Sequence, residues 1–220
     1  MSKIIPQKPI LITLYGYPGS GKTYLSRQLS EAFTIAHLQA DRIRAELFEN
    51  PQYDQKENKI INQLMNYMTE EFLNAGVSVI YDINALRSAQ RSALKDLAKQ
   101  CRVDNLLIWF QMDIETAYLR NKKRDRRRAD DKYSAGWDRQ AFKNQISGMQ
   151  NPTTSENYLV LSGKHSFQTQ KNAIFNRLRE MSIIQPSDTT SHLTMPGMVN
   201  LVPQANLGRV DLSRRNIVIK

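Results

Sequence analysis

The chain has little of what several common classes of protein require. It holds one cysteine, Cys101, so it has neither an intrachain disulfide nor a cysteine-rich zinc site. Its three histidines, His37, His165 and His192, show none of the spacings typical of metal ligands. No apolar run approaches the roughly 20 residues of a membrane-spanning helix, and no signal peptide is recognisable. The sequence therefore predicts a cytoplasmic protein without a membrane partner.

What is present indicates a folded domain with excess positive charge. Hydrophobic residues make up 40% of the 220 positions and charged residues 24%, which is ordinary for a globular protein. This length suffices for one α/β domain with a hydrophobic core. The net charge of +10 favours an anionic partner, whether a nucleotide, a nucleic acid or an acidic surface. Charge alone does not choose among these three.

Residues 16–23, GYPGSGKT, match the phosphate-binding motif G-x-x-x-x-G-K-[S/T] at every defined position. The apolar run 10–15 precedes this phosphate loop, and a helical pattern over 22–32 follows it. A strand, a loop and a helix in this order are the context that the motif requires. Small residues let successive backbone N–H groups surround phosphate oxygens at the positive end of the new helix. The sequence therefore predicts nucleotide binding.

Each residue type in the phosphate loop has an expected task. Lys22 reaches the β- and γ-phosphates, and the hydroxyl of Thr23 binds Mg²⁺. The expected cofactors are thus ATP and Mg²⁺. The predicted nucleotide contacts are Gly16, Pro18, Gly19, Ser20, Gly21, Lys22, Thr23 and Tyr24.

Apolar strands alternate with amphipathic helices along the chain. Further strands are expected at 34–38, 77–82, 106–112 and 158–162, and further helices at 54–74, 85–100, 137–150 and 168–181. Such alternation predicts a parallel sheet with helices on both faces. The expected fold is an α/β three-layer sandwich with a five-stranded parallel sheet.

The helical periodicity and the composition also predict which residues form the core and where the domain ends. Helix 54–74 is expected to bury Ile60, Ile61, Leu64, Tyr67, Met68 and Phe72, and helix 85–100 to bury Leu86, Ala89, Ala93, Leu94 and Leu97. Proline, glycine and polar residues become frequent after residue 185. We expect one α/β domain over 1–185 and an extended tail over 186–220.

Three residues beyond the phosphate loop are candidates for chemistry. Asp82 ends an apolar strand, where a carboxylate organises Mg²⁺ through water, although turn or helix capping is the alternative. Asp41 follows the second strand, at the edge where ligands of open α/β sheets bind. It is either a base that takes a proton from an attacking hydroxyl or a helix N-cap. Arg44, one turn later, is either a contact to the acceptor or to Asp41, or a solvated side chain.

A basic stretch over residues 120–128 holds seven lysines and arginines among nine residues. On a helix, Arg120, Arg124, Arg127 and Arg128 would share one side and could close over ATP. A nucleic-acid patch and a solvated basic face are the other interpretations. Trp137, with Tyr133, is either packing or an aromatic platform.

These residues resemble the P-loop kinases related to the phage polynucleotide 5′-hydroxyl kinase and, more loosely, the zeta-toxin-like kinases. The similarity lies in the phosphate loop, in Asp41-Arg42-Ile43-Arg44, and in the run from Gly76 to Arg124. It implies the fold of the kinase-type P-loop NTPases, a kinase domain over 1–185 and an arginine-bearing lid at about 120–157. It also implies that Asp41 is the general base, that Arg44 contacts the acceptor, and that Arg124, with Arg120 and Arg127, covers ATP. No phosphatase domain of the kind fused to some polynucleotide kinases is recognisable.

The sequence thus predicts an ATP- and Mg²⁺-dependent phosphotransferase in which Lys22, Asp41, Arg44 and Arg124 are catalytic and Thr23 and Asp82 hold the metal. The acceptor is a hydroxyl of a nucleic-acid 5′-end, of a small metabolite or of a nucleotide sugar. The second hypothesis is a nucleic-acid-binding protein that binds NTP, without catalysis or with slow hydrolysis. In that case the basic stretch is the interface and Asp41 only a cap.

Overall fold

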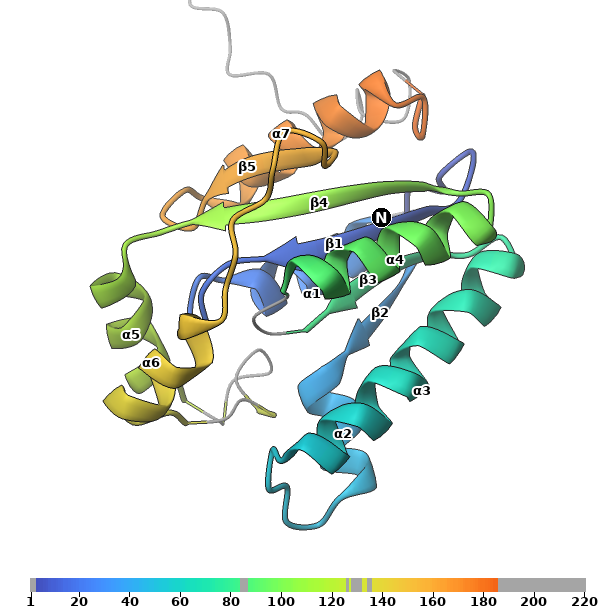
Figure 1. Ribbon diagram of the computed structural model, residues 1–220. Helices are drawn as coiled ribbons and strands as arrows, with labels where there is room; N and C mark the ends of the chain where they lie inside the picture. Colours follow the sequence, from blue (N-terminus) through green and yellow to red (C-terminus); the bar gives the residue numbers. More distant parts are fainter. Residues whose placement is uncertain (1–2, 84–86, 126, 128–131, 134–135, 186–220) are drawn as a thin grey trace, which may run out of the picture.

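The apolar runs of the sequence pair into one parallel sheet. The computed structural model describes residues 3–83, 87–125, 127, 132–133 and 136–185; the predicted tail lies outside them. The sheet has five strands in the order β2-β3-β1-β4-β5 (Figure 1). The strands are β1 Ile10–Tyr15, β2 Ile35–Gln39, β3 Ser78–Asp82, β4 Asp104–Gln111 and β5 Tyr158–Ser162. The sheet, its parallel direction and its five strands confirm the predicted fold class.

The described helices alternate with the strands. They are α1 Lys22–Ala32, α2 Ala40–Leu47, α3 Gln55–Asn74, α4 Ser88–Gln100, α5 Ile114–Lys122, α6 Arg139–Ser147 and α7 Phe167–Glu180. Side chains of aspartate or serine cap α3, α5, α6 and α7 by accepting a hydrogen bond from a backbone N–H in the first turn. No helix within the described ranges is both long and apolar enough to cross a bilayer.

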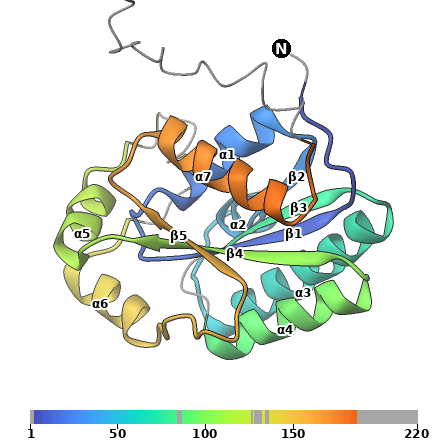
Figure 2. The same cartoon turned by 90° about the horizontal axis from the view of Figure 1, so that it is seen from above.

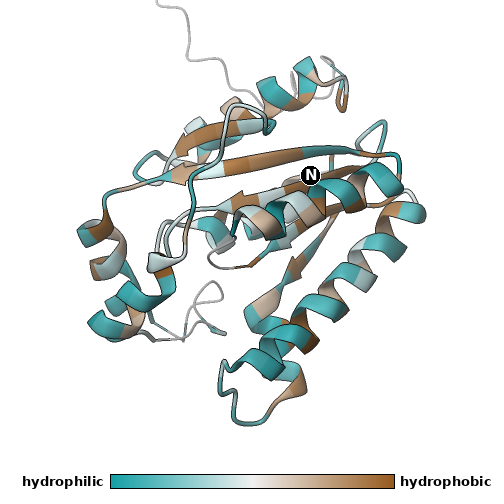
Figure 3. Ribbon diagram, in the orientation of Figure 1, coloured by the Kyte–Doolittle hydropathy of each residue, from teal (hydrophilic) through white to brown (hydrophobic). Residues whose placement is uncertain are grey.

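Two helical layers cover the sheet. Helices α1 and α7 lie on one face and α3 and α4 on the other (Figure 2). Strand β1, in the middle, buries all six of its residues and sends alternate side chains into the two cores. Ile12 and Leu14 join the core under α1 and α7, whereas Leu11 and Tyr15 join the core under α3 and α4. The strands are accordingly the most hydrophobic part of the ribbon (Figure 3).

Helix α3 buries a narrower line of residues than its apolar pattern predicts, although Met68 and Phe72 also pack against the core as expected. Ile61, Met65 and Leu73 are buried, but Ile60 is 47% exposed and Tyr67 61% exposed. The buried residues of α3 recur at every fourth position, which makes a narrow buried face. The predicted apolar stripe was broader and included residues beside that face.

Helix α4 differs from prediction in a more informative way. Ala89 and Ala93 are exposed, and the buried position between them is taken by Arg91. The Arg91 guanidinium lies 4.9 Å from the centre of the Tyr15 ring and forms an ion pair of 2.7 Å with Glu156. A charged side chain thus occupies a core-facing position because it ties the segment before β5 to α4. The predicted position Leu86 lies outside the described residues.

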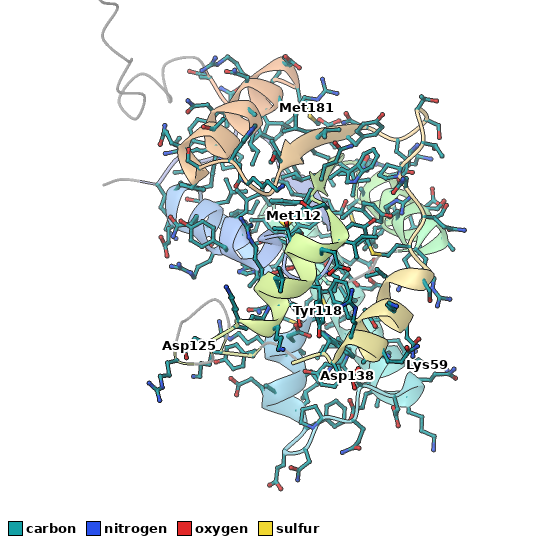
Figure 4. The ribbon with its side chains drawn as sticks, turned by 90° about the vertical axis from the view of Figure 1, so that its left-hand side faces the viewer. Lys59, Met112, Tyr118, Asp125, Asp138 and Met181 are labelled. Carbon is teal, nitrogen blue, oxygen red and sulfur yellow. The ribbon has the colours of Figure 1, made fainter. Side chains whose placement is uncertain are left out.

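The carboxyl ends of the strands carry the segments that build the site. Helices α5 and α6 lie beyond this edge of the sheet (Figure 1). Tyr118 of α5 is labelled in Figure 4, and the centre of its ring lies 5.4 Å from that of Phe142 in α6. Helix α5 also packs onto the phosphate loop. A Cβ atom on Gly19 would clash with the carbonyl oxygen of Ala117. Only a residue without a side chain permits this approach.

We predict that Gly19→Ala destabilises the protein more than Gly21→Ala. Both glycines have positive φ, +88° and +99°, so either alanine is strained by about 1–2 kcal/mol. Only Gly19 meets the backbone of α5, whereas nothing lies within 4 Å of a Cβ on Gly21. The extra clash should cost about 1–3 kcal/mol, measured as free energy of unfolding in urea. Equal losses in the two variants would show that α5 does not pack on the loop in this way.

Candidate functional site

The phosphate loop encloses the side chain of Lys22. Its Nζ donates hydrogen bonds to the carbonyl oxygens of Gly16, at 2.8 Å, and Tyr17, at 3.0 Å. Only 4% of Lys22 is exposed. Burial lowers the pKa of this ammonium to about 8, although the negative charges of Asp82 and Asp41 favour its charged form.

The loop has the features of a cradle for anions. Gly21 adopts a left-handed conformation and leads into α1, whose N-terminus faces the loop. The hydroxyl of Ser20 is buried and has no hydrogen-bond partner among the described residues. A ligand with phosphate oxygens would supply that partner, so the residues present fit a nucleoside triphosphate. Thr23 is partly exposed in the first turn of α1, next to Lys22.

Asp82 closes β3 next to this loop and is only 4% exposed. One of its carboxylate oxygens lies 3.0 Å from Nε2 of His37 on β2, the neighbouring strand. His37 lies within the strand expected at 34–38, and no sequence motif marks it as a partner of Asp82. The register of the sheet identifies His37 as a partner of Asp82. Gln39 pairs with Asp82, so His37, two residues before Gln39, lies on the same face of the sheet as Asp82. That register is known only from the folded sheet.

Asp41 lies in the first turn of α2, directly after β2. The helix cap is Gln39, not Asp41, so the interpretation of Asp41 as an N-cap is wrong. The pKa of Asp41 is raised to about 6, first by burial and then by the negative charge of Asp82. Positive charges of Arg124, Arg44 and Lys22 act in the opposite direction. Asp41, the predicted general base, and Lys22 of the phosphate loop therefore belong to one electrostatic cluster.

Arg44 is buried rather than solvated, which excludes one interpretation of the sequence. Its Nη1 lies 2.9 Å from the carboxylate of Glu57, and its Nη2 donates to the side chain of Asn58 at 2.7 Å. The guanidinium also stands over the ring of Tyr53, 4.5 Å from its centre. Its Nε is buried without a partner among the described residues. The ion-pair partner of Arg44 is thus Glu57, which the sequence pattern did not indicate.

Helix α5 ends at Lys122, so only the first residues of the basic stretch are helical. Its arginines therefore do not form the one helical face that was predicted. Arg120 is exposed and donates from Nη1 to the carbonyl oxygen of Gly163, at 2.7 Å, in the loop after β5. Arg124 is partly buried, and its charge acts on both Lys22 and Asp41. Arg127 is exposed, and Arg128 lies outside the described residues.

A cleft of about 430 Å³ opens beside Asp41. Helices α2, α3, α4 and α6 and the segments next to them supply its walls. The ring of Trp137 contacts that of Tyr53, with 5.7 Å between centres, rather than the predicted partner Tyr133. The lining residues are Ala40, Asp41, Arg44, Tyr53, Asn58, Asn62, Ile83, Arg87, Gln90, Trp137, Asn144, Gln145 and Gly148.

Solved structures with the same architecture are P-loop kinases and related proteins. A sugar kinase from Janibacter sp. HTCC2649 matches with a TM-score of 0.58 and 16% identity, over 82% of this chain and 98% of that one. The APS kinase CysC of Mycobacterium tuberculosis, solved with AMPPNP and APS, matches with a TM-score of 0.57 and 17% identity, over 79% and 99%. Kti12 of Chaetomium thermophilum, in complex with ADP-AlF3, gives 0.59 and 15%, over 80% and 100%.

These identities are low, so the structural likeness shows a shared fold. No curated protein matches the sequence. The model of the AAA_33 family, described as an AAA domain, matches residues 11–152, which include the phosphate loop, Asp41, Asp82 and the basic stretch. Because this match spans more than half of the chain, the protein belongs to the AAA_33 family of AAA domains and has the fold of the P-loop kinases.

Proposed function

We propose that this protein is a phosphotransferase that moves the γ-phosphoryl group of ATP to a hydroxyl group of an acceptor, with Mg²⁺ as cofactor. The observation that carries the proposal is the position of Asp41. This carboxylate lines the cleft and also belongs to the charge cluster of Lys22 and Asp82. A protein that only binds nucleotide has no need of a base between a nucleotide site and a second cleft.

The phosphate loop and its neighbours would hold the donor. Loop amides and Lys22 would bind the phosphates, while Thr23 and Asp82 would hold Mg²⁺, directly or through water. His37 would fix the Asp82 carboxylate by its hydrogen bond. Bound Mg²⁺ would neutralise charge on the phosphate oxygens. Nucleotide complexes of the APS kinase and of Kti12, which share this fold, support the choice of ATP.

The transfer step follows from the charges around Asp41. Asp41 accepts the proton of the acceptor hydroxyl while the oxygen attacks the γ-phosphorus, and the bond between that phosphorus and the β–γ bridging oxygen breaks. ADP leaves with the electrons of that bond. Arg124 and Lys22 stabilise the negative charge during transfer. Residues of about 120–157, which begin in the last turn of α5 and include α6, would act as the lid, with Arg120 near the nucleotide.

Several acceptors are compatible with this chemistry. The resemblance to polynucleotide and zeta-toxin-like kinases suggests a nucleic-acid 5′-hydroxyl. The names of structures that share the fold, a sugar kinase and the gluconokinase of Sinorhizobium meliloti 1021, suggest small hydroxylated molecules. The exposed side chains of Arg120 and Arg127 favour a second candidate function, an NTP-dependent nucleic-acid binder. The proposed phosphotransferase would act in the cytoplasm.

We predict that Asp41→Asn lowers phosphoryl transfer by about 10²- to 10⁴-fold, the range typical for loss of a general base. Binding of ATP should persist, because the phosphates are held by the loop. Transfer is measured with γ-labelled ATP and a panel of hydroxyl acceptors, and binding by calorimetry. Asp96→Asn, at an exposed position of α4, is the matched control and should change neither quantity.

If the Asp41→Asn variant transfers phosphate at an unchanged rate, Asp41 is not the general base and this mechanism is wrong. The absence of transfer from the unaltered protein, together with salt-sensitive binding of oligonucleotides, would favour the nucleic-acid binder.

We predict a bell-shaped dependence of kcat/KM on pH. Asp41 must be ionised to accept a proton, so the rate should rise with pH through its pKa of about 6. Lys22 must be charged to bind phosphate, so the rate should fall above its pKa of about 8 in the free enzyme. Steady-state kinetics from pH 5 to 9.5 test both limbs. A flat profile between pH 5 and 7 would show that Asp41 does not titrate during catalysis.

A further inference from the structure

We propose that the acceptor is a small, oxygen-rich molecule with an anionic group, and that Arg87 binds this group while a hydroxyl faces Asp41. This inference rests on the proposed function, because it assigns the substrate class of the same cleft. It follows from the size of the cleft, from the hydrogen-bonding groups that line it, and from an arginine there that has no carboxylate partner among the described residues.

The size of the cleft favours a small molecule. Its volume of about 430 Å³ falls in the range of about 300–1,000 Å³ that is usual for small-molecule sites. Walls come from helices on both sides, α2 and α3 on one and α4 and α6 on the other. Among the described basic side chains of residues 120–127, none lines the cleft. The described part of the basic stretch therefore does not continue into the acceptor site as a track for a polynucleotide backbone.

Two hydrogen-bond donors in the cleft walls have no acceptor. Nε of Arg44 and Nε1 of Trp137 are both buried and unpartnered within the described part of the chain. Arg44 itself is only 4% exposed. A buried N–H group without a partner is destabilising, and a ligand oxygen or a water molecule would relieve it. The surplus of donors indicates a ligand rich in oxygen acceptors.

The remaining polar lining is mostly amide. Each side-chain amide both donates and accepts, which matches hydroxyl groups, since these also do both. Five such side chains surround the cleft, from α3, α4 and α6: Asn58, Asn62, Gln90, Asn144 and Gln145. A molecule with several hydroxyls satisfies this lining better than an apolar or a cationic one.

Arg87 provides the charge. It precedes α4 as the N-cap residue, and its side chain is exposed at the cleft. A Cβ on Gly148 would lie 3.1 Å from Nε and Nη2 of Arg87, so the backbone after α6 packs against the guanidinium. No carboxylate pairs with Arg87 among the residues that the structure describes. Arg44, in contrast, is already neutralised by Glu57.

This difference between the two arginines assigns their tasks. Arg44 stabilises the wall of the cleft by its hydrogen bonds to Glu57 and Asn58. The guanidinium of Arg87 can instead bind a carboxylate or phosphate of the ligand through two parallel hydrogen bonds. One unpaired arginine suits one anionic group. A nucleic-acid end would bring several successive phosphates to a cleft whose described lining offers one such cation.

The experiment compares matched acceptors with γ-labelled ATP: sugar alcohols, the sugar acids and sugar phosphates of the same carbon skeletons, and a 5′-hydroxyl oligonucleotide. We expect kcat/KM to be at least tenfold higher for an acid or phosphate than for its alcohol. Arg87→Met should reduce this ratio at least tenfold, mainly through KM, and Arg87→Lys should restore part of it. Arg102→Met, at an exposed position beyond the other end of α4, is the control and should keep the ratio.

Two results would overturn the inference while the proposed phosphotransferase stands: equal kcat/KM for the neutral and anionic members of each pair, or an oligonucleotide that exceeds every small acceptor. Calorimetry with AMPPNP and the same acceptors separates the two proposals. If the anionic acceptors bind in an Arg87-dependent way but no transfer occurs, the proposed reaction fails and the assignment of the cleft holds. If they neither bind nor react, the assignment of the cleft fails.

Discussion

The buried ammonium group of Lys22 is the constraint on which the site depends. A charge that is 4% exposed must be compensated, and two carbonyl oxygens of the phosphate loop together with the charges of Asp82 and Asp41 do so. Those two carboxylates in turn repel each other, which helps to raise the pKa of Asp41. The cluster is stable as a whole because each charge offsets the burial of another, and Arg124 is coupled to it from beyond α5.

The parallel sheet makes this cluster possible. Because all five strands run in one direction, the carboxyl ends of β1, β2 and β3 meet at one edge and bring the phosphate loop, Asp41 and Asp82 together. The same edge separates two environments. On one side the loop presents amides and an unpartnered serine hydroxyl, which suit phosphate. Asp41 faces the other side, where amides, aromatic rings and Arg87 line the cleft.

The site residues differ in how far the sequence could identify them. The phosphate loop was recognisable because its function depends on the backbone, and only a narrow set of small residues allows that backbone. Asp41 and Asp82 were recognisable because they follow apolar strands. The cleft was not, since its lining comes from four helices and from residues as far apart as Ala40 and Gly148. His37 and Glu57 were missed for the same reason: each is identified only by its partner.

The sequence by itself determined the fold class, the five strands to within two residues, and the position of the phosphate loop, because these depend on local periodicity and on a contiguous motif. Only the tertiary structure decided that Asp41 is no helix cap, that Arg44 pairs with Glu57, and that Arg91 occupies a core-facing position of α4. Periodicity predicts that a residue faces inward, but the neighbours that it meets there come from distant segments. Whether a buried charge is neutralised or left to bind a ligand is therefore a property of the folded chain.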